Sequence, residues 1–119
     1  MIKYAIITCI FILFDIITGF IKAWSQKNID SVVLRQGLMH KLSEIVAIAF
    51  GFLCEYATSY IDIGVSLPLS GGICTYIIIM EIISILENII IINPELKRLF
   101  GKYLDKLKDT ETEGDEKNK

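Results

Sequence analysis

The sequence predicts an all-α membrane protein with three transmembrane helices, a C-terminal amphipathic surface helix and a disordered polar tail. Its 119 residues are 53% apolar, which is more than a soluble domain usually carries. The apolar residues gather in three long runs, and most charged residues lie between or after those runs. This uneven distribution is typical of a chain that crosses a bilayer several times.

Three apolar runs are each long enough to be a transmembrane helix. A hydrocarbon core about 30 Å thick is crossed by about 20 residues of α-helix. The third run is rich in isoleucine, which also favours a buried strand, but its length favours a helix. The predicted spans, within a transmembrane domain of residues 1–93, cover residues 4–23, 43–60 and 71–92.

The first run begins near the N-terminus, where a cleaved signal peptide is the alternative to a transmembrane helix. Asp15 interrupts its apolar core, and Ile21 stands where an A-x-A cleavage pattern ending at Ala23 needs a small residue. Both features favour a retained helix. Trp24 follows the run and suits an anchor at the level of the lipid headgroups.

Capping residues mark where two further helices begin. Asp30 or Ser31 is placed to cap a short helix within the polar, basic segment of residues 24–42. Asn93, followed by Pro94, is placed to cap a helix that starts after the third span.

The helix predicted over residues 94–108 is amphipathic. Its apolar residues recur at helical spacing, which favours a position on the membrane surface; a soluble helix packed on a partner is the alternative. Residues 109–119 are polar and charged, which predicts a disordered tail. The apolar face consists of Leu96, Leu99, Phe100, Tyr103, Leu104 and Leu107, and the basic residues elsewhere on this helix include Lys97, Arg98, Lys102 and Lys106.

The basic residues predict the orientation of the chain. They gather between the first two spans and after the third, and residues 61–70 contain none. Because short cytoplasmic loops carry the excess of Lys and Arg, the N-terminus is expected outside and the C-terminus inside. Lys3 opposes this orientation, but it stands in a tail short enough to be translocated.

Polar residues inside the spans form one face on each helix, at about 100° per residue. An ionised side chain at the bilayer centre costs at least about 2.5 kcal/mol. No lysine or arginine occupies a central position in a span, so the acids are either protonated or in contact with water. The predicted faces are Asp15, Thr18 and Gly19 in the first span, Glu44, Gly51, Glu55 and Thr58 in the second, and Glu81, Ser84, Glu87 and Asn88 in the third.

Two interpretations of these polar faces stay open at this point. They hydrogen-bond one another inside a three-helix bundle, or they line a water-filled pore in an oligomer. The sequence holds no nucleophile with a matching base, no phosphate-binding glycine loop and no cluster of metal ligands, so we expect neither an enzyme nor a cofactor or metal. The net charge of −2 does not favour nucleic acid, and we expect no small-molecule substrate.

Two motifs resemble the toxin secretion/phage lysis holin family. Residues 15–23, DIITGFIKA, resemble the D-x-x-T/L-G-x-x-x-A motif of that family's first helix. Residues 81–88, EIISILEN, resemble its E-x-x-S-I-x-E/K-N signature and are followed by a proline turn at Pro94. The family's loop pattern between them is matched by Asn28, Ser31, Gly37 and Lys41.

The resemblance covers about residues 14–99 and implies a phage holin. Such a protein accumulates in the host's bacterial cytoplasmic membrane as a multi-pass homo-oligomer among membrane lipids. At a set time it forms lesions that let out endolysin, for host cell lysis, or a toxin in some clostridial relatives. An antiholin or regulatory membrane scaffold is the alternative, with an antiholin also a candidate partner. A small ion channel or transporter is less favoured, because four-helix multidrug transporters carry an essential glutamate where the first span here has an aspartate.

Overall fold

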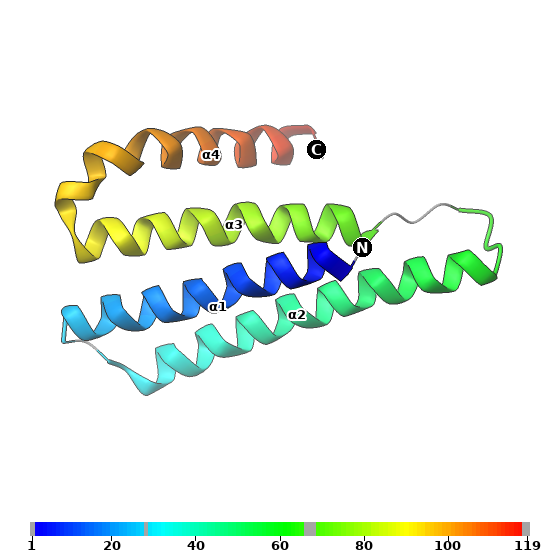
Figure 1. The fold of residues 1–119 in the computed structure, drawn as a ribbon, viewed down its shortest axis with the longest axis horizontal. Helices are drawn as coiled ribbons and strands as arrows, with labels where there is room; N and C mark the ends of the chain where they lie inside the picture. Colours follow the sequence, from blue (N-terminus) through cyan, green and yellow to red (C-terminus); the bar gives the residue numbers. More distant parts are fainter. Residues whose placement is uncertain (1, 28, 66–68, 118–119) are drawn as a thin grey trace. The chain divides into compact units, whose positions relative to one another are not determined.

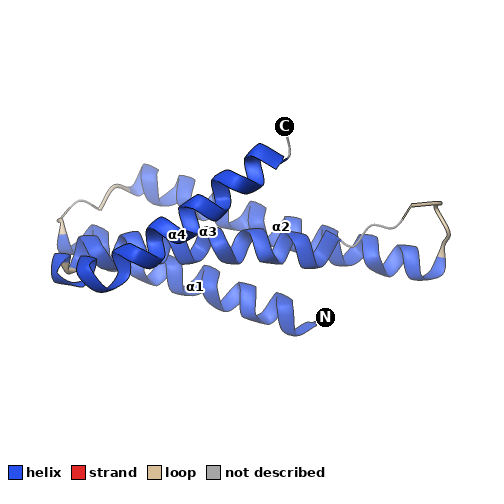
Figure 2. Cartoon of the chain, turned by 90° about the horizontal axis from the view of Figure 1, so that it is seen from above, coloured by secondary structure: helices blue, strands red, loops and turns tan. Residues whose placement is uncertain are grey.

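The computed structural model describes residues 2–27, 29–65 and 69–117, with side chains described through residue 110. Over these ranges the chain is helical and holds no strand, as Figure 1 and Figure 2 show. Three of the described helices are long and apolar enough to cross a membrane, which confirms the predicted fold class. The elements are α1 (Ile2–Ser25), α2 (Ser31–Tyr60), α3 (Leu69–Ile92), the 3₁₀ turn η1 (Pro94–Leu96) and α4 (Lys97–Lys117).

The helices α1 and α3 contain the first and third predicted spans. Each starts two residues earlier than predicted, and α1 also ends two residues later. Thr8 illustrates how α1 accommodates polar side chains among its apolar ones. Its hydroxyl donates to the carbonyl of Tyr4 at 2.6 Å, so the polar group is satisfied by the helix itself.

The helix α2 is longer than predicted. Asp30 caps it as expected, since its carboxylate accepts the Val32 N–H at 2.9 Å. The predicted short helix and the predicted second span form one helix, which runs without interruption from Ser31 to Tyr60. Between these points the chain carries Leu, Arg, Gln, Met and Lys, which favour helix, and no proline to end it.

The helix α4 also extends further than predicted. Asn93 is the cap, as predicted, and its side chain accepts the Glu95 N–H at 3.2 Å. The helix continues to Lys117, whereas we expected it to end at Lys108 and to be followed by disorder. Glutamate and lysine are good helix formers, so a polar composition does not by itself end a helix. Residues 118–119 lie outside the described ranges.

The chain divides into two compact units, each built from parts of several helices. The first unit comprises Met1–Ile12 and Asp30–Ile78, and so contains the start of α1, all of α2 and the start of α3. The second unit comprises Leu13–Ile29 and Ile79–Lys119, with the remainder of α1 and α3 and all of α4. The residues of the predicted polar faces therefore lie partly in the first unit and partly in the second, and each group has its own contacts.

Candidate functional site

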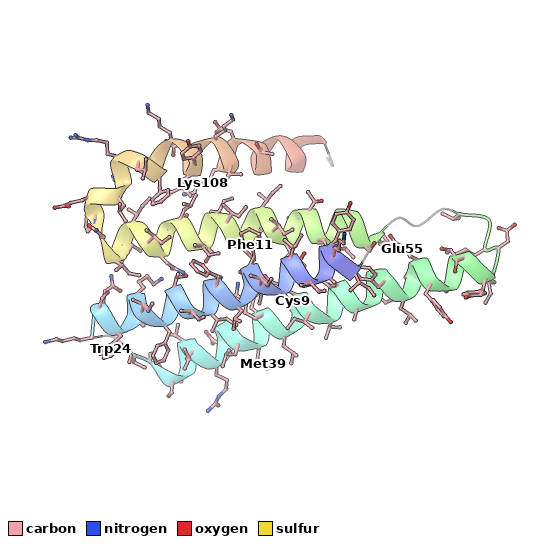
Figure 3. The ribbon with its side chains drawn as sticks, in the orientation of Figure 1. Cys9, Phe11, Trp24, Met39, Glu55 and Lys108 are labelled. Atoms are coloured by element: carbon pink, nitrogen blue, oxygen red, sulfur yellow. The ribbon has the colours of Figure 1, made fainter. Side chains whose placement is uncertain are left out.

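In the first unit, Glu55 of α2 binds the beginning of α3. Its Oε1 accepts the Ser70 N–H at 3.1 Å and the Ser70 hydroxyl at 2.5 Å. Since α3 begins at Leu69, the Ser70 N–H is one of those that have no partner within the helix. Figure 3 shows Glu55 on α2 near the start of α3. The acid therefore acts as a cap contributed by another helix, where a negative charge also favours the helix N-terminus.

Gly51, one turn before Glu55, lets α2 approach α3 closely. It is buried, and a Cβ added to it would lie 3.0 Å from Cδ1 of Ile73 and 3.3 Å from Cα of Ser70. A helix approaches another most closely where a small residue stands at the contact. Gly51 thus sets the separation at which Glu55 reaches the Ser70 main chain.

Two other members of the predicted α2 face contact residues of their own helix. The Thr58 hydroxyl donates to the carbonyl of Glu55 at 3.1 Å. The Glu44 carboxylate lies 3.2 Å from Nε2 of His40 and 3.9 Å from Nζ of Lys41. Glu44 also lines an open groove of about 450 Å³ between α2 and α3, together with Ala47, Ile73 and Tyr76.

In the second unit, a buried polar cluster connects α1 with α3. The side-chain amide Nδ2 of Asn88 donates to Oδ1 of Asp15 at 3.0 Å and to Oγ1 of Thr18 at 3.1 Å. The Thr18 hydroxyl donates to the carbonyl of Asp15 at 3.1 Å. All three side chains are at most 6% exposed. Gly19 faces the same amide, since a Cβ there would lie 3.7 Å from Nδ2. The structure therefore brings four predicted residues together.

The other predicted residues of α3 lie in different surroundings. Glu81 is 1% exposed, and Ser84 is half-buried. Glu87 is 44% exposed at its side chain and forms an ion pair with Lys108 of α4, at 3.0 Å between Oε1 and Nζ. Lys108 lies on the α4 side of this contact in Figure 3. The predicted face of α3 is thus divided between a buried part and a part that attaches α4.

The apolar face predicted for α4 is only partly covered. Leu96, Phe100, Leu104 and Leu107 are half-buried, whereas Leu99 and Tyr103 are about 60% exposed. All four predicted basic residues are exposed, namely Lys97, Arg98, Lys102 and Lys106. One apolar edge of the helix is therefore half-buried, and Tyr103 and the basic side chains are left available to a membrane surface.

Sequence reasoning missed Ser70 and Lys108 as site residues. The signal for Ser70 was its place at the junction of a loop with the third span, where a carboxylate finds N–H donors. No signal identified Lys108, because a pairing between two separate helices leaves no local pattern. Within the described ranges, no group of three or more His, Cys, Asp or Glu side chains is arranged to hold a metal ion.

These features define a class of protein. A chain with three helices of span length, joined by buried polar contacts, is a multi-pass membrane protein. Residues 1–109 match the bacteriophage holin family, and the chain belongs to that family. This match confirms the family that the two sequence motifs predicted. No curated protein matches the chain, and neither does any solved structure. The holin family is not a family of enzymes.

Proposed function

We propose that this chain acts as a holin that oligomerises in the bacterial cytoplasmic membrane and, at a timed moment, forms lesions that release endolysin or a toxin. The match to the holin family over residues 1–109 carries this proposal. Three helices of span length support it. The buried polar side chains add further support, because a purely structural bundle of apolar helices has no need of acids in its spans.

The proposed orientation has the N-terminus outside and the C-terminus in the cytoplasm. It rests on the basic residues at the end of α1, in the connection to α2 and in the first half of α2, and on those along α4, compared with none in residues 61–70. Ile63→Cys tests it, since that side chain is 53% exposed between α2 and α3. An impermeant thiol reagent added outside should label it before any lesion opens. Labelling only from the cytoplasmic side would contradict the orientation.

The polar faces are proposed to change surroundings when the lesion opens. In the single chain the Asp15 carboxylate accepts from Asn88, and Glu55 accepts from Ser70. A closed assembly can therefore keep the Asp15 carboxylate dry, whereas Oε2 of Glu55 is buried and accepts no hydrogen bond within the described residues. In a ring of subunits, separation of these contacts would turn the same side chains toward water, while the isoleucine-rich faces stay against lipid.

The function is tested first by expressing the protein alone in a bacterium. Membrane potential and growth are followed after induction. A sudden collapse of the potential after a delay is the expected result, because lesions dissipate ion gradients at once. Indefinite tolerance of the protein in the membrane would contradict a holin and favour an antiholin or regulatory scaffold.

The lumen is tested by labelling Glu55→Cys and Glu81→Cys singly, in a chain whose thiols at Cys9, Cys54 and Cys74 have been replaced by alanine. Labelling by an impermeant reagent only after triggering is expected. Ile17→Cys, which is 47% exposed on α1, is the lipid-facing control and should not label. If neither acid site labels while lysis proceeds, the polar faces are internal packing.

The C-terminal helix is proposed to tune the timing of lesion formation. Its exposed Lys97, Arg98 and Lys102 would each contribute about 1 kcal/mol to attraction toward anionic lipid. Charge reversal at these sites should shift the lysis time, and so should removal of residues 109–119. Both variants should still insert into the membrane. A truncated chain that fails to insert would show that the segment is structural.

A further inference from the structure

The contacts between α2 and α3 in the first unit show which residues of the two helices lie at the same level. Glu55 accepts hydrogen bonds from the N–H and the hydroxyl of Ser70. A Cβ at Gly51 would lie 3.3 Å from Cα of Ser70 and 3.0 Å from Cδ1 of Ile73. These two residues of α2 therefore lie beside the first turn of α3.

The start of α3 lies close to one boundary of the hydrocarbon core. The 24 residues of α3 extend about 36 Å, which exceeds a core of about 30 Å only slightly. In the proposed orientation this is the outer boundary, and Glu55 lies at the same level. Beyond it α2 carries Tyr56 and Tyr60, which are 65% and 75% exposed with ring centroids 5.1 Å apart. Tyrosine is enriched at the level of the lipid headgroups, so both side chains suit that position.

The rise of α2 from Glu55 places two charged residues inside the core. An α-helix rises about 1.5 Å per residue, so Glu44 lies about 16 Å and Lys41 about 21 Å inward of Glu55. Both values fall near the middle of a core about 30 Å thick. The same rise puts Arg35 about 30 Å from Glu55, at the level of the inner headgroups. The span predicted over residues 43–60 had instead left Lys41 outside the core.

The groove between α2 and α3 supports this depth. Glu44 lines the groove together with Tyr76 and Ile77 of α3. Ile77 stands seven residues after Ser70, which is about 10 Å further into the membrane along α3. Glu44 therefore lies beside residues of the third span and not beside the end of a loop.

Glu44 and Lys41 face each other at this depth. Oε2 of Glu44 lies 3.9 Å from Nζ of Lys41, and the two side chains are only 11% and 14% exposed. This Oε2 is buried and accepts no hydrogen bond within the described residues, whereas Oε1 lies 3.2 Å from Nε2 of His40. Charged side chains within a membrane are costly unless they pair with one another. The contact therefore supplies Glu44 with a counter-charge from its own helix.

We propose that Lys41 and Glu44 form an ion pair inside the hydrocarbon core, which α2 crosses with about residues 35–55. The polar face of α2 then contains a cation as well as acids, so Glu44 needs no counter-charge from a neighbouring chain. The orientation of the chain is unchanged, because Lys27 and Arg35 remain on the cytoplasmic side. The depth of α2 is a property of the inserted chain, so it is measured whether or not a lesion opens.

The depth is tested by quenching of tryptophan fluorescence with brominated lipids. Trp24→Phe removes the one tryptophan of the full chain, and Met39→Trp or Tyr56→Trp then introduces another at a site 59% or 65% exposed. The vesicles contain phosphatidylcholine and phosphatidylglycerol with bromine atoms halfway along the acyl chains. Met39 lies about 24 Å inward of Glu55, within the core, so its variant should be quenched more than the Tyr56 variant. A span over residues 43–60 requires the reverse order, and equal or reversed quenching would overturn the proposal.

The pairing is tested by Lys41→Met and Glu44→Leu, made singly and together in the full chain. Each single change leaves one charge in the core, so the fraction of protein that resists alkaline extraction from membranes should fall. The double variant should regain the wild-type fraction, because apolar replacement of both members of a buried ion pair is often tolerated. Arg35→Met combined with Glu44→Leu is the control and should regain nothing.

Two outcomes of the extraction experiment would contradict the pair. A double variant that inserts no better than Glu44→Leu alone would show that Lys41 and Glu44 act independently. Single variants that insert as well as the wild-type chain would show that both side chains lie outside the core. Either result overturns the proposal and leaves the holin function standing, because neither fluorescence nor extraction depends on the opening of a lesion.

Discussion

In the first unit Glu55 of α2 binds both the main-chain N–H and the hydroxyl of Ser70 in α3, whereas in the second unit α1 meets α3 through an amide side chain. Gly51 lets α2 approach the Ser70 backbone, and Glu55 accepts that residue's N–H. Asp15 instead accepts the side-chain amide of Asn88. The close approach at Gly51 tolerates no added bulk, and only the main-chain part of this contact is independent of which side chain α3 carries at residue 70. The contact of α1 with α3 is less sensitive to side-chain size, but it depends on one amide group, that of Asn88.

The largest effect is expected for Gly51→Leu. The new side chain would overlap Ile73 and the backbone of Ser70, and overpacking costs up to about 3 kcal/mol. We expect the free energy of unfolding in detergent micelles, followed by circular dichroism, to fall by about that amount. Gly37→Leu is the control, because nothing lies within 4 Å of a Cβ there. Similar losses in both variants would contradict the close approach at Gly51.

The next effect concerns the Asn88 amide. Asn88→Leu removes two hydrogen bonds from a buried cluster, and we expect the free energy of unfolding to fall by about 2 kcal/mol. A double-mutant cycle with Asp15→Leu isolates the pair. Hydrogen bonds between transmembrane helices average about 0.6 kcal/mol and reach about 1.7 kcal/mol. A coupling near 1 kcal/mol is expected; additive effects would show that the two residues act independently.

A smaller effect is expected at Glu55. Glu55→Leu removes the acceptor that caps α3, and loss of a cap costs about 1 kcal/mol. Glu55→Gln keeps an acceptor for Ser70 while it removes the charge, so its loss should be about half as large. Unfolding in micelles measures both variants. If glutamine destabilises the chain as much as leucine does, the charge and not the hydrogen bond is the essential feature.

The smallest effect on stability is expected at the ion pair that attaches α4. Both side chains of Glu87 and Lys108 are about half exposed, and such pairs contribute about 0 to 1 kcal/mol. Lys108→Gln should change the free energy of unfolding by less than about 0.5 kcal/mol. It should still alter the lysis time, because α4 is released more easily from α3. The control is Lys106→Gln, because Lys106 is exposed on the same helix. It should change the free energy of unfolding and the lysis time less than Lys108→Gln does.

The sequence by itself determined the fold class, the three spans and the family. The lengths of the apolar runs predicted three spans, because crossing a hydrocarbon core needs about 20 helical residues whatever the tertiary structure. Asp30 and Asn93 predicted two helix starts, because a cap bonds to N–H groups only two or three residues away. The continuation of α2 through residues 31–42 and of α4 to Lys117 was missed, since polar composition obscured good helix formers.

Only the tertiary structure decided which partner each polar side chain has. Helical spacing placed Asp15, Glu55 and Glu87 on polar faces, but a spacing of three or four residues is the same whatever lies opposite. The structure pairs the first with an amide, the second with a helix N-terminus and the third with a lysine. Whether these faces line a lumen stays a prediction. Partners far apart in sequence meet only through packing, so the periodicity of one helix specifies a face and not its neighbour.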